Sequence, residues 1–449
     1  MNNSMEVTVI RAFKKSFAAL SVVALGVGAF PVTTFATGPT KPAAVGALTS
    51  SRTQAPGISS EGRAVTDWSV IAQNAIVSVE RRFPGEAAVY MGMVHATIYD
   101  VVVAIHGGYR PYAFTPAAVP ANTSVDAAVA SAVHRVLVER SPVQKQTLDE
   151  VYSEYLNGIA DGEAKTNGIL VGEEVGVGML QLRANDGLDT VVDYDQPQPG
   201  PGVYEPTAPL PPLGVRMPDV RPLALNAASQ FRPDGRPKLT SGKYAQDFNE
   251  VNDLGRFDSS VRSEKQTAVA RFWTDHDIAQ WNRSLLRLAD ARGLTTIERA
   301  RMMAMAHVAG GDAMIGCFDA KYEFLSWRPI HAIRRADTDD NARTAPDPGW
   351  QPLLTTPNHP EYPSAHACHT TAIAEALEGF FGPGRVSFSV DSLVTGETRY
   401  YNHFKEVVDE VNNARVWAGF HFRFSQEDGS KLGRKVGRFV VKNFFQPLD

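Results

Sequence analysis

The sequence predicts an all-α fold made of two related helical bundles, and three features of the chain support this prediction. Apolar residues recur at spacings of three and four over long stretches of both halves, as expected for helices that bury one face. Eleven of the chain's 29 prolines lie between Pro197 and Pro237, so no helix can run through this segment. A weak internal repeat relates the half before this segment to the half after it.

The repeat pairs residues 68–100 with residues 281–312. Each copy begins with a Trp and ends with an Asp, and each has a His five positions before that Asp. The matched residues are Trp68, His95 and Asp100 in the first copy, and Trp281, His307 and Asp312 in the second. Because both copies have helical spacing, we expect a pair of helices in each half that carries its His and Asp at corresponding places.

The predicted elements follow from the spacing and from breaks at Pro and Gly. Helical spacing covers 66–107, with a turn at Phe83-Pro84-Gly85, and then 124–141 and 142–185. Helices resume at Lys243 and continue to the end of the chain, with loops at 338–360 and 382–389. The predicted divisions are a signal at 1–36, a flexible lead-in at 37–63, a first bundle at 64–190, an irregular proline-rich connector at 191–242 and a second bundle at 243–449.

Residues 1–36 have the pattern of a secretory signal. Basic residues at 11–15 precede an apolar run at 17–30, and Thr34-Phe35-Ala36 supplies small residues for cleavage. The apolar run is too short for a membrane-spanning helix. We therefore expect the mature chain to begin near Thr37 and to be secreted or periplasmic.

Charge and hydropathy exclude two classes of partner. The formal net charge of −5, without a basic cluster, excludes a nucleic-acid partner. The most apolar later stretch, 89–105, is interrupted by His95 and Asp100, so we expect a buried helix with polar anchors. No membrane span is therefore expected to remain after removal of the signal.

The chain has two cysteines, Cys317 and Cys368, and each lies near a block of charged residues described next. A disulfide between them is one alternative in an oxidising compartment. The other alternative is a pair of buried free thiols that pack as small apolar side chains.

Three short blocks in the last third of the chain are suited to bind one tetrahedral oxyanion. They are residues 321–329 with Lys321 and Arg328, residues 362–366 with Ser364, Ala365 and His366, and residues 414–421 with Arg415 and His421. Guanidinium groups donate hydrogen bonds to anion oxygens in pairs, and a Lys adds a point charge. Together the blocks predict a phosphate or vanadate site.

The local spacing suggests how each block is built. Lys321 and Arg328 are seven residues apart, which places them on one face of a helix that Pro329 would end. Ser364 precedes a helical stretch, where free N–H groups favour an anion. Gly419, between Arg415 and His421, permits close approach of backbone or ion. The alternatives are a solvated basic face for the first block and an ordinary Ser cap with an incidental His for the second.

The order of these residues resembles that of the superfamily joining vanadium-dependent haloperoxidases to type 2 phosphatidic acid phosphatases. That order is Lys, six residues, Arg-Pro, then Pro-Ser-Gly-His, then Arg, five residues, His. Two positions depart from it, because Ala365 replaces the Gly and Ser425 replaces an Asp four residues after the last His. We expect Glu427 or Asp428 to supply the missing carboxylate. The runs 321–324 and 421–424 are more similar to the soluble bacterial haloperoxidases than to the lipid phosphatases.

This resemblance implies two four-helix bundles with vanadate bound near the end of the second. His421 would ligate the metal, while Lys321, Arg328, Ser364, the Ala365 N–H and Arg415 would hold its oxygens. His366 would exchange protons with hydrogen peroxide, and Lys321 would polarise the peroxide for attack by a halide or small organic substrate. A homodimer is also expected. His359, His369 and His403 are expected to be ordinary core or surface histidines.

Two other functions fit the same residues. A secreted acid phosphatase would need no vanadate: His421 would attack phosphorus to form a phosphohistidine, and His366 would protonate the leaving alcohol. The Ser at position 425 weakens the phosphatase interpretation, because a nucleophilic His gains most from a carboxylate behind it. The same departure leaves open a third interpretation, a degenerate protein that binds an oxyanion without catalysis.

Overall fold

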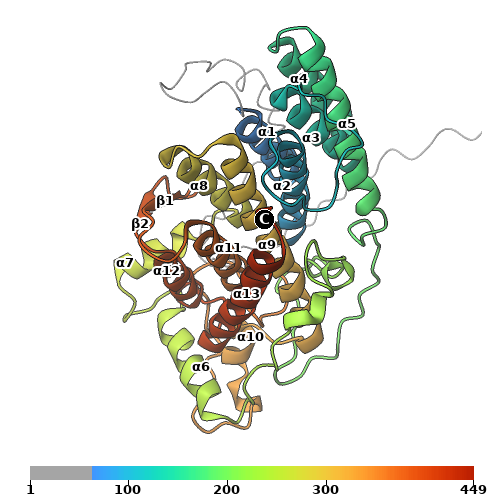
Figure 1. Cartoon of the computed structure of the whole chain (residues 1–449). Coiled ribbons are helices and arrows are strands. Elements are labelled where there is room, and N and C mark those ends of the chain that lie inside the picture. Colours follow the sequence, from blue (N-terminus) through green and yellow to red (C-terminus); the bar gives the residue numbers. More distant parts are fainter. Residues whose placement is uncertain (1–62, 449) are drawn as a thin grey trace, which may run out of the picture. The chain divides into compact units, whose positions relative to one another are not determined.

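A computed structural model gives the structure of residues 63–448 as thirteen α-helices and one two-stranded hairpin (Figure 1). The helices before the connector are α1 (Arg63–Gln73), α2 (Pro84–His106), α3 (Val125–Arg140), α4 (Lys145–Asn157) and α5 (Glu163–Leu182). Those after it are α6 (Gly242–Leu254), α7 (Glu264–Phe272), α8 (Asp277–Ala291), α9 (Thr296–Phe324), α10 (Pro329–Arg334), α11 (Ala365–Phe381), α12 (Phe404–Trp417) and α13 (Arg423–Asn443). The all-α prediction is confirmed. The predicted signal and nearly all of the lead-in lie outside the described residues.

The proline-rich connector is irregular, as the sequence predicts. Between α5 and α6 it contains only two short 3-10 helices, at Met217–Asp219 and Ala228–Phe231. Leu223, Ala224 and Leu225 in this connector donate their backbone N–H groups to Asp312 of α9, at 2.6–2.8 Å. The connector is thereby attached to the second half of the chain.

Helices α2 and α9 pack along each other in the core (Figure 1). By length and composition α2 could cross a membrane, but 89% of its most apolar window is buried inside the protein, as expected for a core helix. His95 of α2 stacks on His307 of α9, with ring centroids 4.3 Å apart and an angle of 7° between the rings. The two histidines of the sequence repeat therefore meet where the halves of the chain join.

The aspartates of the repeat make equivalent contacts. Asp100 accepts backbone N–H groups from Tyr112, Ala113 and Phe114, just as Asp312 accepts three consecutive N–H groups from the connector. Each carboxylate thus ties a long core helix to the loop that crosses it. The structure explains the repeat as two copies of one local arrangement.

The repeat extends to a second pair of helices in each half. Glycines of α5 (Gly168, Gly172 and Gly176) face carbonyl oxygens of α3, and glycines of α13 (Gly429, Gly433 and Gly437) face carbonyl oxygens of α11. A Cβ at any of these glycines would overlap the opposing backbone, so both helix pairs need glycine for their close packing. Helix α11 is therefore the counterpart of α3, and its first capping residue, Ser364, is the counterpart of Ser124.

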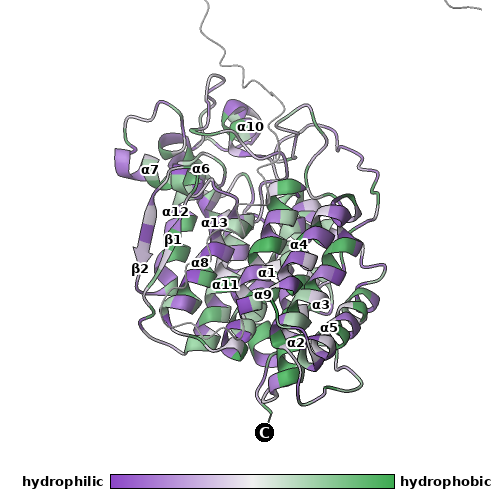
Figure 2. Ribbon diagram, turned by 90° about the horizontal axis from the view of Figure 1, so that it is seen from above, coloured by the Kyte–Doolittle hydropathy of each residue, from purple (hydrophilic) through white to green (hydrophobic). Residues whose placement is uncertain are grey.

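The hairpin after α11 differs from the prediction. The sequence analysis expected helix from residue 390 on, but β1 (Phe388–Asp391) pairs antiparallel with β2 (Thr398–Tyr401) beside α8 (Figure 2). Phe388 and Val390 alternate with less buried residues, which is strand spacing, and Gly396 turns the chain at φ +71°. The run is too short for its period to be distinguished from a helix by spacing alone.

Candidate active site

The three sequence blocks converge on one buried site. Lys321 lies in the last turn of α9, Arg415 lies in the last turns of α12, and Ser364 caps α11. His421 follows in the link between α12 and α13. The relative exposures of these four residues are 0–3%, so the site is closed off from bulk solvent.

Arg328 reaches the site by a different route from the one predicted. Helix α9 ends at Phe324, and Leu325 adopts a left-handed conformation with φ +42°. Pro329 begins α10 and does not end the preceding helix, because a Pro fits the first helical position, where no N–H is needed. Lys321 and Arg328 therefore share a pocket without sharing a helix.

Backbone carbonyl groups hold Lys321 and Arg328 in place. The Lys321 ammonium donates to the carbonyl oxygens of Pro360 (2.7 Å) and Glu361 (3.0 Å). Arg328 donates from Nε to the His359 carbonyl (2.8 Å) and from Nη1 to the Phe420 carbonyl (3.0 Å). Both cations are thus held mainly by the chain segment that leads into Ser364. We call Lys321, Arg328, Ser364 and Arg415 the cage, and its donor groups are already in place before an anion binds.

Arg415 closes another side of the cage. Its Nη1 donates to the carbonyl oxygen of Trp273 (2.8 Å), and its guanidinium carbon lies 4.6 Å from the centre of the Phe420 ring. Its buried Nε has no hydrogen-bond partner among residues 63–448. Gly419 permits this arrangement, because at φ +80° it turns the chain sharply between Arg415 and His421 against the backbone of Gly255 and Pro352.

His421 has its two ring nitrogens in different environments. Its Nδ1 lies 2.9 Å from the Glu361 carboxylate, and its Nε2 lies 3.2 Å from Arg328 Nη1. A carboxylate accepts, so Nδ1 carries the proton, and Nε2 then faces the cations with its lone pair. This is the tautomer needed to ligate a metal oxyanion or to attack phosphorus.

Glu361 is the functional residue that sequence analysis missed. It is fully buried, and its carboxylate also accepts the backbone N–H of Phe422 at 3.1 Å. The predicted substitutes are wrong: Glu427 pairs with Lys243, while Asp428 accepts the Tyr362 hydroxyl. The available signal was that Glu361 lies directly beside the Tyr-Pro-Ser block and is the only acidic residue between Asp347 and Glu375.

Ser425, where the superfamily has Asp, still lies near the imidazole. Its Oγ is 3.5 Å from His421 Nδ1 and 3.4 Å from the Glu361 carbonyl oxygen. The carboxylate behind His421 therefore comes from the segment before α11, and the Ser occupies the position that the Asp would fill. The departure at Ser425 is a relocation of the carboxylate and not a loss.

Ser364 and Ser124 occupy equivalent positions before α11 and α3, but only Ser124 acts as an ordinary helix cap. Ser124 accepts the N–H of Ala127 with its side chain, as a capping Ser does. Ser364 makes no such bond, and its Oγ is buried without a partner. A hydroxyl free at the first turn of a helix is available to an anion. Ala365 is helical, so the positive φ that a Gly would permit is not needed here.

This contrast gives a prediction. Ser364→Ala should leave the free energy of unfolding nearly unchanged, because no capping bond is lost, and should weaken anion binding. Ser124→Ala is the matched control and should cost about 1 kcal/mol of stability without affecting the anion. Denaturant unfolding and isothermal titration with orthovanadate measure the two effects. A large stability loss in Ser364→Ala with unchanged anion affinity would show that Ser364 is only a cap.

Burial shifts the pKa values of the charged residues in the site toward their neutral forms. Burial, with help from Arg328, lowers the pKa of Lys321 to about 8 and that of Arg415 to about 9. Burial also lowers the pKa of Arg328 to about 10 and raises that of Glu361 to about 7, although Arg328 and Lys321 oppose the latter shift. Burial and the cations keep the pKa of His421 well below its usual value. A bound oxyanion would offset the repulsion among the cations.

His366 stands at the open side of the cage. It is partly exposed, unlike Lys321, Arg328, Ser364, Arg415 and His421, which are buried. Burial and Arg415 lower its pKa to about 3, whereas Asp277 raises it. His366 is therefore neutral and can accept a proton from a molecule that enters the site.

The three weaker histidines differ from one another. His359 is buried against Arg328, whose Nη2 lies 3.0 Å from its Nδ1, so this residue belongs to the wall of the site. His369 lies 3.4 Å from the buried carboxylate of Asp277, next to His366. His403 caps α12 near the surface. The expectation of an ordinary histidine holds for His403 and is wrong for His359.

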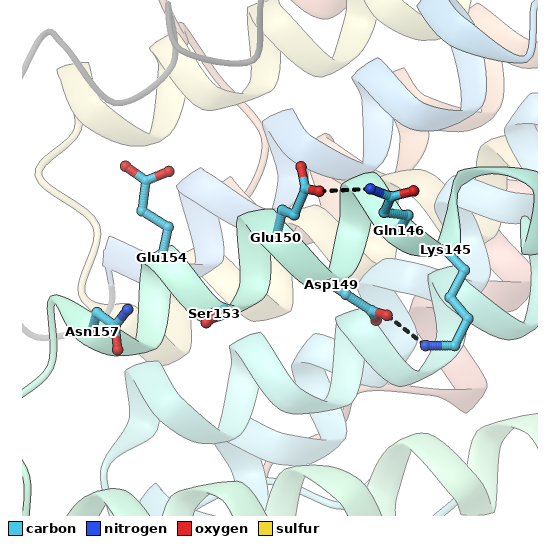
Figure 3. Close-up of a pocket in the computed structure, with 7 residues that line it drawn as sticks. All are labelled: Lys145, Gln146, Asp149, Glu150, Ser153, Glu154 and Asn157. Carbon is cyan, nitrogen blue, oxygen red and sulfur yellow. Dashed lines mark hydrogen bonds and ion pairs between the residues drawn. The ribbon is translucent and has the colours of Figure 1, made fainter.

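A surface depression on α4 has no comparable chemistry. Its lining residues are Lys145, Gln146, Asp149, Glu150, Ser153, Glu154 and Asn157 (Figure 3). Lys145 pairs with Asp149, and Gln146 donates to Glu150, within the same helix. These are ordinary pairs of an exposed helix, and the single cation is already neutralised.

Comparisons with known proteins agree with the site. The family model of the VCPO second helical-bundle domain matches residues 301–449, which contain all three blocks. The vanadium chloroperoxidase of Curvularia inaequalis is 27% identical over 173 residues, a match that covers 28% of this chain and 28% of that protein. The match thus spans less than a third of the length of that curated relative.

The fold extends the likeness over most of the chain. The structure of the first bacterial vanadium-dependent iodoperoxidase superposes with a TM-score of 0.72 at 23% identity, covering 88% of this chain and all of that one. Holo and apo forms of a bacterial vanadium-dependent chloroperoxidase superpose with TM-scores of 0.65 and 0.62, at 16% and 15% identity, covering 80% and 87% of this chain and 92% and 95% of those chains. These likenesses show a shared fold.

Proposed function

We propose that this chain is a member of the superfamily of vanadium-dependent haloperoxidases and type 2 phosphatidic acid phosphatases, and that it is a haloperoxidase that oxidises a halide with hydrogen peroxide. One observation carries the proposal. Lys321, Arg328 and Arg415 are buried and all act electrostatically on His421, whose Nε2 lies 3.2 Å from Arg328 Nη1. The buried Ser364 hydroxyl has no partner among the described residues.

The residues of the cage fit vanadate. Three cations, a free hydroxyl and a helix N-terminus match an ion that carries several negatively charged oxygens. An imidazole with a directed lone pair fits a metal centre, and Glu361 fixes its tautomer. In this assignment His421 ligates the metal, while Lys321, Arg328, Ser364, the Ala365 N–H and Arg415 hold the oxygens.

The protein side of the reaction follows from these positions. Bound vanadate would activate hydrogen peroxide as a Lewis acid, without a change in its own oxidation state. His366, which is neutral and partly exposed, would accept a proton from hydrogen peroxide at its imidazole nitrogen and later give it up again. Lys321 would donate a hydrogen bond to an oxygen of the bound group and so make it more susceptible to the halide. Hypohalous acid is the expected product, and a small organic molecule is the expected acceptor of the halogen.

Glu361 supports a second candidate, a phosphatase. A nucleophilic His gains most from a carboxylate on its far nitrogen, and Glu361 supplies one at 2.9 Å. The Ser at position 425 therefore does not disfavour phosphoryl transfer. In this function the same cations bind a phosphate monoester, His421 attacks phosphorus and His366 protonates the leaving alcohol.

Parallel assays of the purified protein distinguish the two functions. Bromide oxidation with orthovanadate and peroxide is expected, and phosphate should inhibit it because both ions need one cage. Lys321→Met should weaken binding of both ions, whereas Lys145→Met on the exposed face of α4 should change nothing. Aryl phosphate hydrolysis without vanadate, in the absence of bromide oxidation, would contradict the proposal and support the phosphatase.

We also propose a secreted or periplasmic location, because a basic and then apolar segment precedes a cleavage pattern at 34–36. A homodimer is proposed as the oligomeric state. Fractionation with N-terminal sequencing tests the first proposal, and size-exclusion chromatography with light scattering tests the second.

A further inference from the structure

Two thiols lie side by side behind the anion-binding cage. Cys317 is in α9, one helical turn before Lys321, and Cys368 is in α11, two residues after His366. Both are free, and both have a relative exposure of 0%. The two thiols interact with each other across the packed helices α9 and α11, and Cys317 Sγ lies 3.6 Å from the Pro363 carbonyl oxygen. Of the two alternatives, the pair of buried free thiols is confirmed, and the disulfide is not formed.

The surroundings favour reaction at Cys317. Burial raises the pKa of its thiol, yet the hydrogen bond with Cys368 and the charges of Lys321 and Arg328 outweigh burial, so this pKa lies below its usual value. Burial instead raises the pKa of Cys368 well above its usual value. A thiolate beside a thiol is the arrangement in which oxidation of the first sulfur is followed by attack of the second.

We propose that Cys317 and Cys368 are a redox pair that closes to a disulfide when the oxidant of the neighbouring site reaches them. The inference rests on the proposed function for the source of that oxidant. The Cys317 thiolate attacks the halogen of hypohalous acid, forming a sulfenyl halide and releasing hydroxide. The Cys368 thiol then attacks this sulfur, forming the disulfide and releasing halide and a proton. Two sulfurs lose two electrons, and the halogen gains them.

The pair would limit self-inflicted damage. A lone thiol near such an oxidant proceeds to sulfinic and sulfonic acids, which thiol reductants do not reverse. A negatively charged acid at Cys317 would also neutralise Lys321 and occupy space behind the cage. The disulfide ends the oxidation at a reversible bond, and it joins α9 to α11, the helices that carry Lys321 and His366.

The test uses the full chain and the variants Cys317→Ser and Cys368→Ser. Each reduced protein is treated with bromide, orthovanadate and peroxide, or with hypobromous acid added directly, and is then denatured in iodoacetamide for intact mass measurement. The wild type should lose two hydrogens, take no label and regain both thiols after dithiothreitol. Cys368→Ser should gain oxygen at Cys317 that dithiothreitol does not remove.

Two results would overturn the inference. One is a wild-type protein whose thiols both take the label after added hypobromous acid. The other is a disulfide between two chains, seen as a dimer on a non-reducing gel. Treatment with added hypobromous acid does not depend on halide oxidation by the protein. If the disulfide forms in this treatment but bromide, orthovanadate and peroxide give no activity, the proposed function is contradicted and the redox pair is still supported.

Discussion

His421→Ala is expected to abolish vanadate-dependent halide oxidation, even with orthovanadate in excess. The variant loses the nitrogen that faces the cations, while Lys321, Arg328 and Arg415 keep their carbonyl partners. Orthovanadate should still bind weakly through charge, which ⁵¹V NMR can measure. Phosphatase activity should vanish in the same variant, because the nucleophile is gone.

Controls for this variant separate chemistry from folding. His106→Ala removes an exposed histidine at the end of α2 and should retain full activity. His421→Gln keeps an N–H for Glu361 and should fold even if the alanine variant, with its buried carboxylate unpaired, does not. Full halide oxidation by a folded His421 variant would refute the assignment.

Glu361→Gln should lower vanadate affinity and turnover by about 10- to 100-fold, the range for residues that orient a metal-binding His. The neutral amide can no longer stabilise the Nδ1–H, so the imidazole loses basicity at Nε2. Glu361→Gln combined with Ser425→Asp should recover much of the loss, because Ser425 Oγ lies 3.5 Å from the same Nδ1. A merely structural role for Glu361 would not be rescued in this way.

The pH profile gives an independent test of Glu361. Burial raises the pKa of this acid to about 7, so it gains a proton as the pH falls through about 7 and no longer accepts as a carboxylate. Vanadate affinity of the wild type should therefore weaken below about pH 7. The vanadate affinity of Glu361→Gln should not show this loss. The Ser425→Asp variant alone should not improve activity, since two carboxylates at one imidazole would repel each other. A marked gain in that variant would contradict the role of Glu361.

The helical fold could be predicted from the sequence because it depends on local pattern, whereas the six residues proposed to hold the anion stay a prediction. Helical spacing, the prolines of the connector and the His and Asp of the repeat all act over short distances along the chain. The superfamily order of residues then brought the three blocks together. Their convergence could not have been derived from spacing alone.

Two of the errors have one cause in common, which is the choice of partner across the fold. Glu361 precedes His421 by 60 residues, and only tertiary packing brings its carboxylate to the imidazole. His359 likewise became part of the site through Arg328. Pro329 was predicted to end a helix, although a Pro also fits the first position of a helix. The local sequence does not distinguish the two cases.

The burial of the cage affects how fast an anion enters and leaves it. Of the anion-binding residues and His366, only His366 is partly exposed, so an anion that enters or leaves must pass His366 or displace packed side chains. We expect movement of these side chains, and not diffusion, to limit the rate of exchange. Activation by orthovanadate should be slow and should reach a limiting rate as its concentration rises. Phosphate taken up during purification should leave equally slowly, so the measured activity of a preparation would depend on its history as well as its composition.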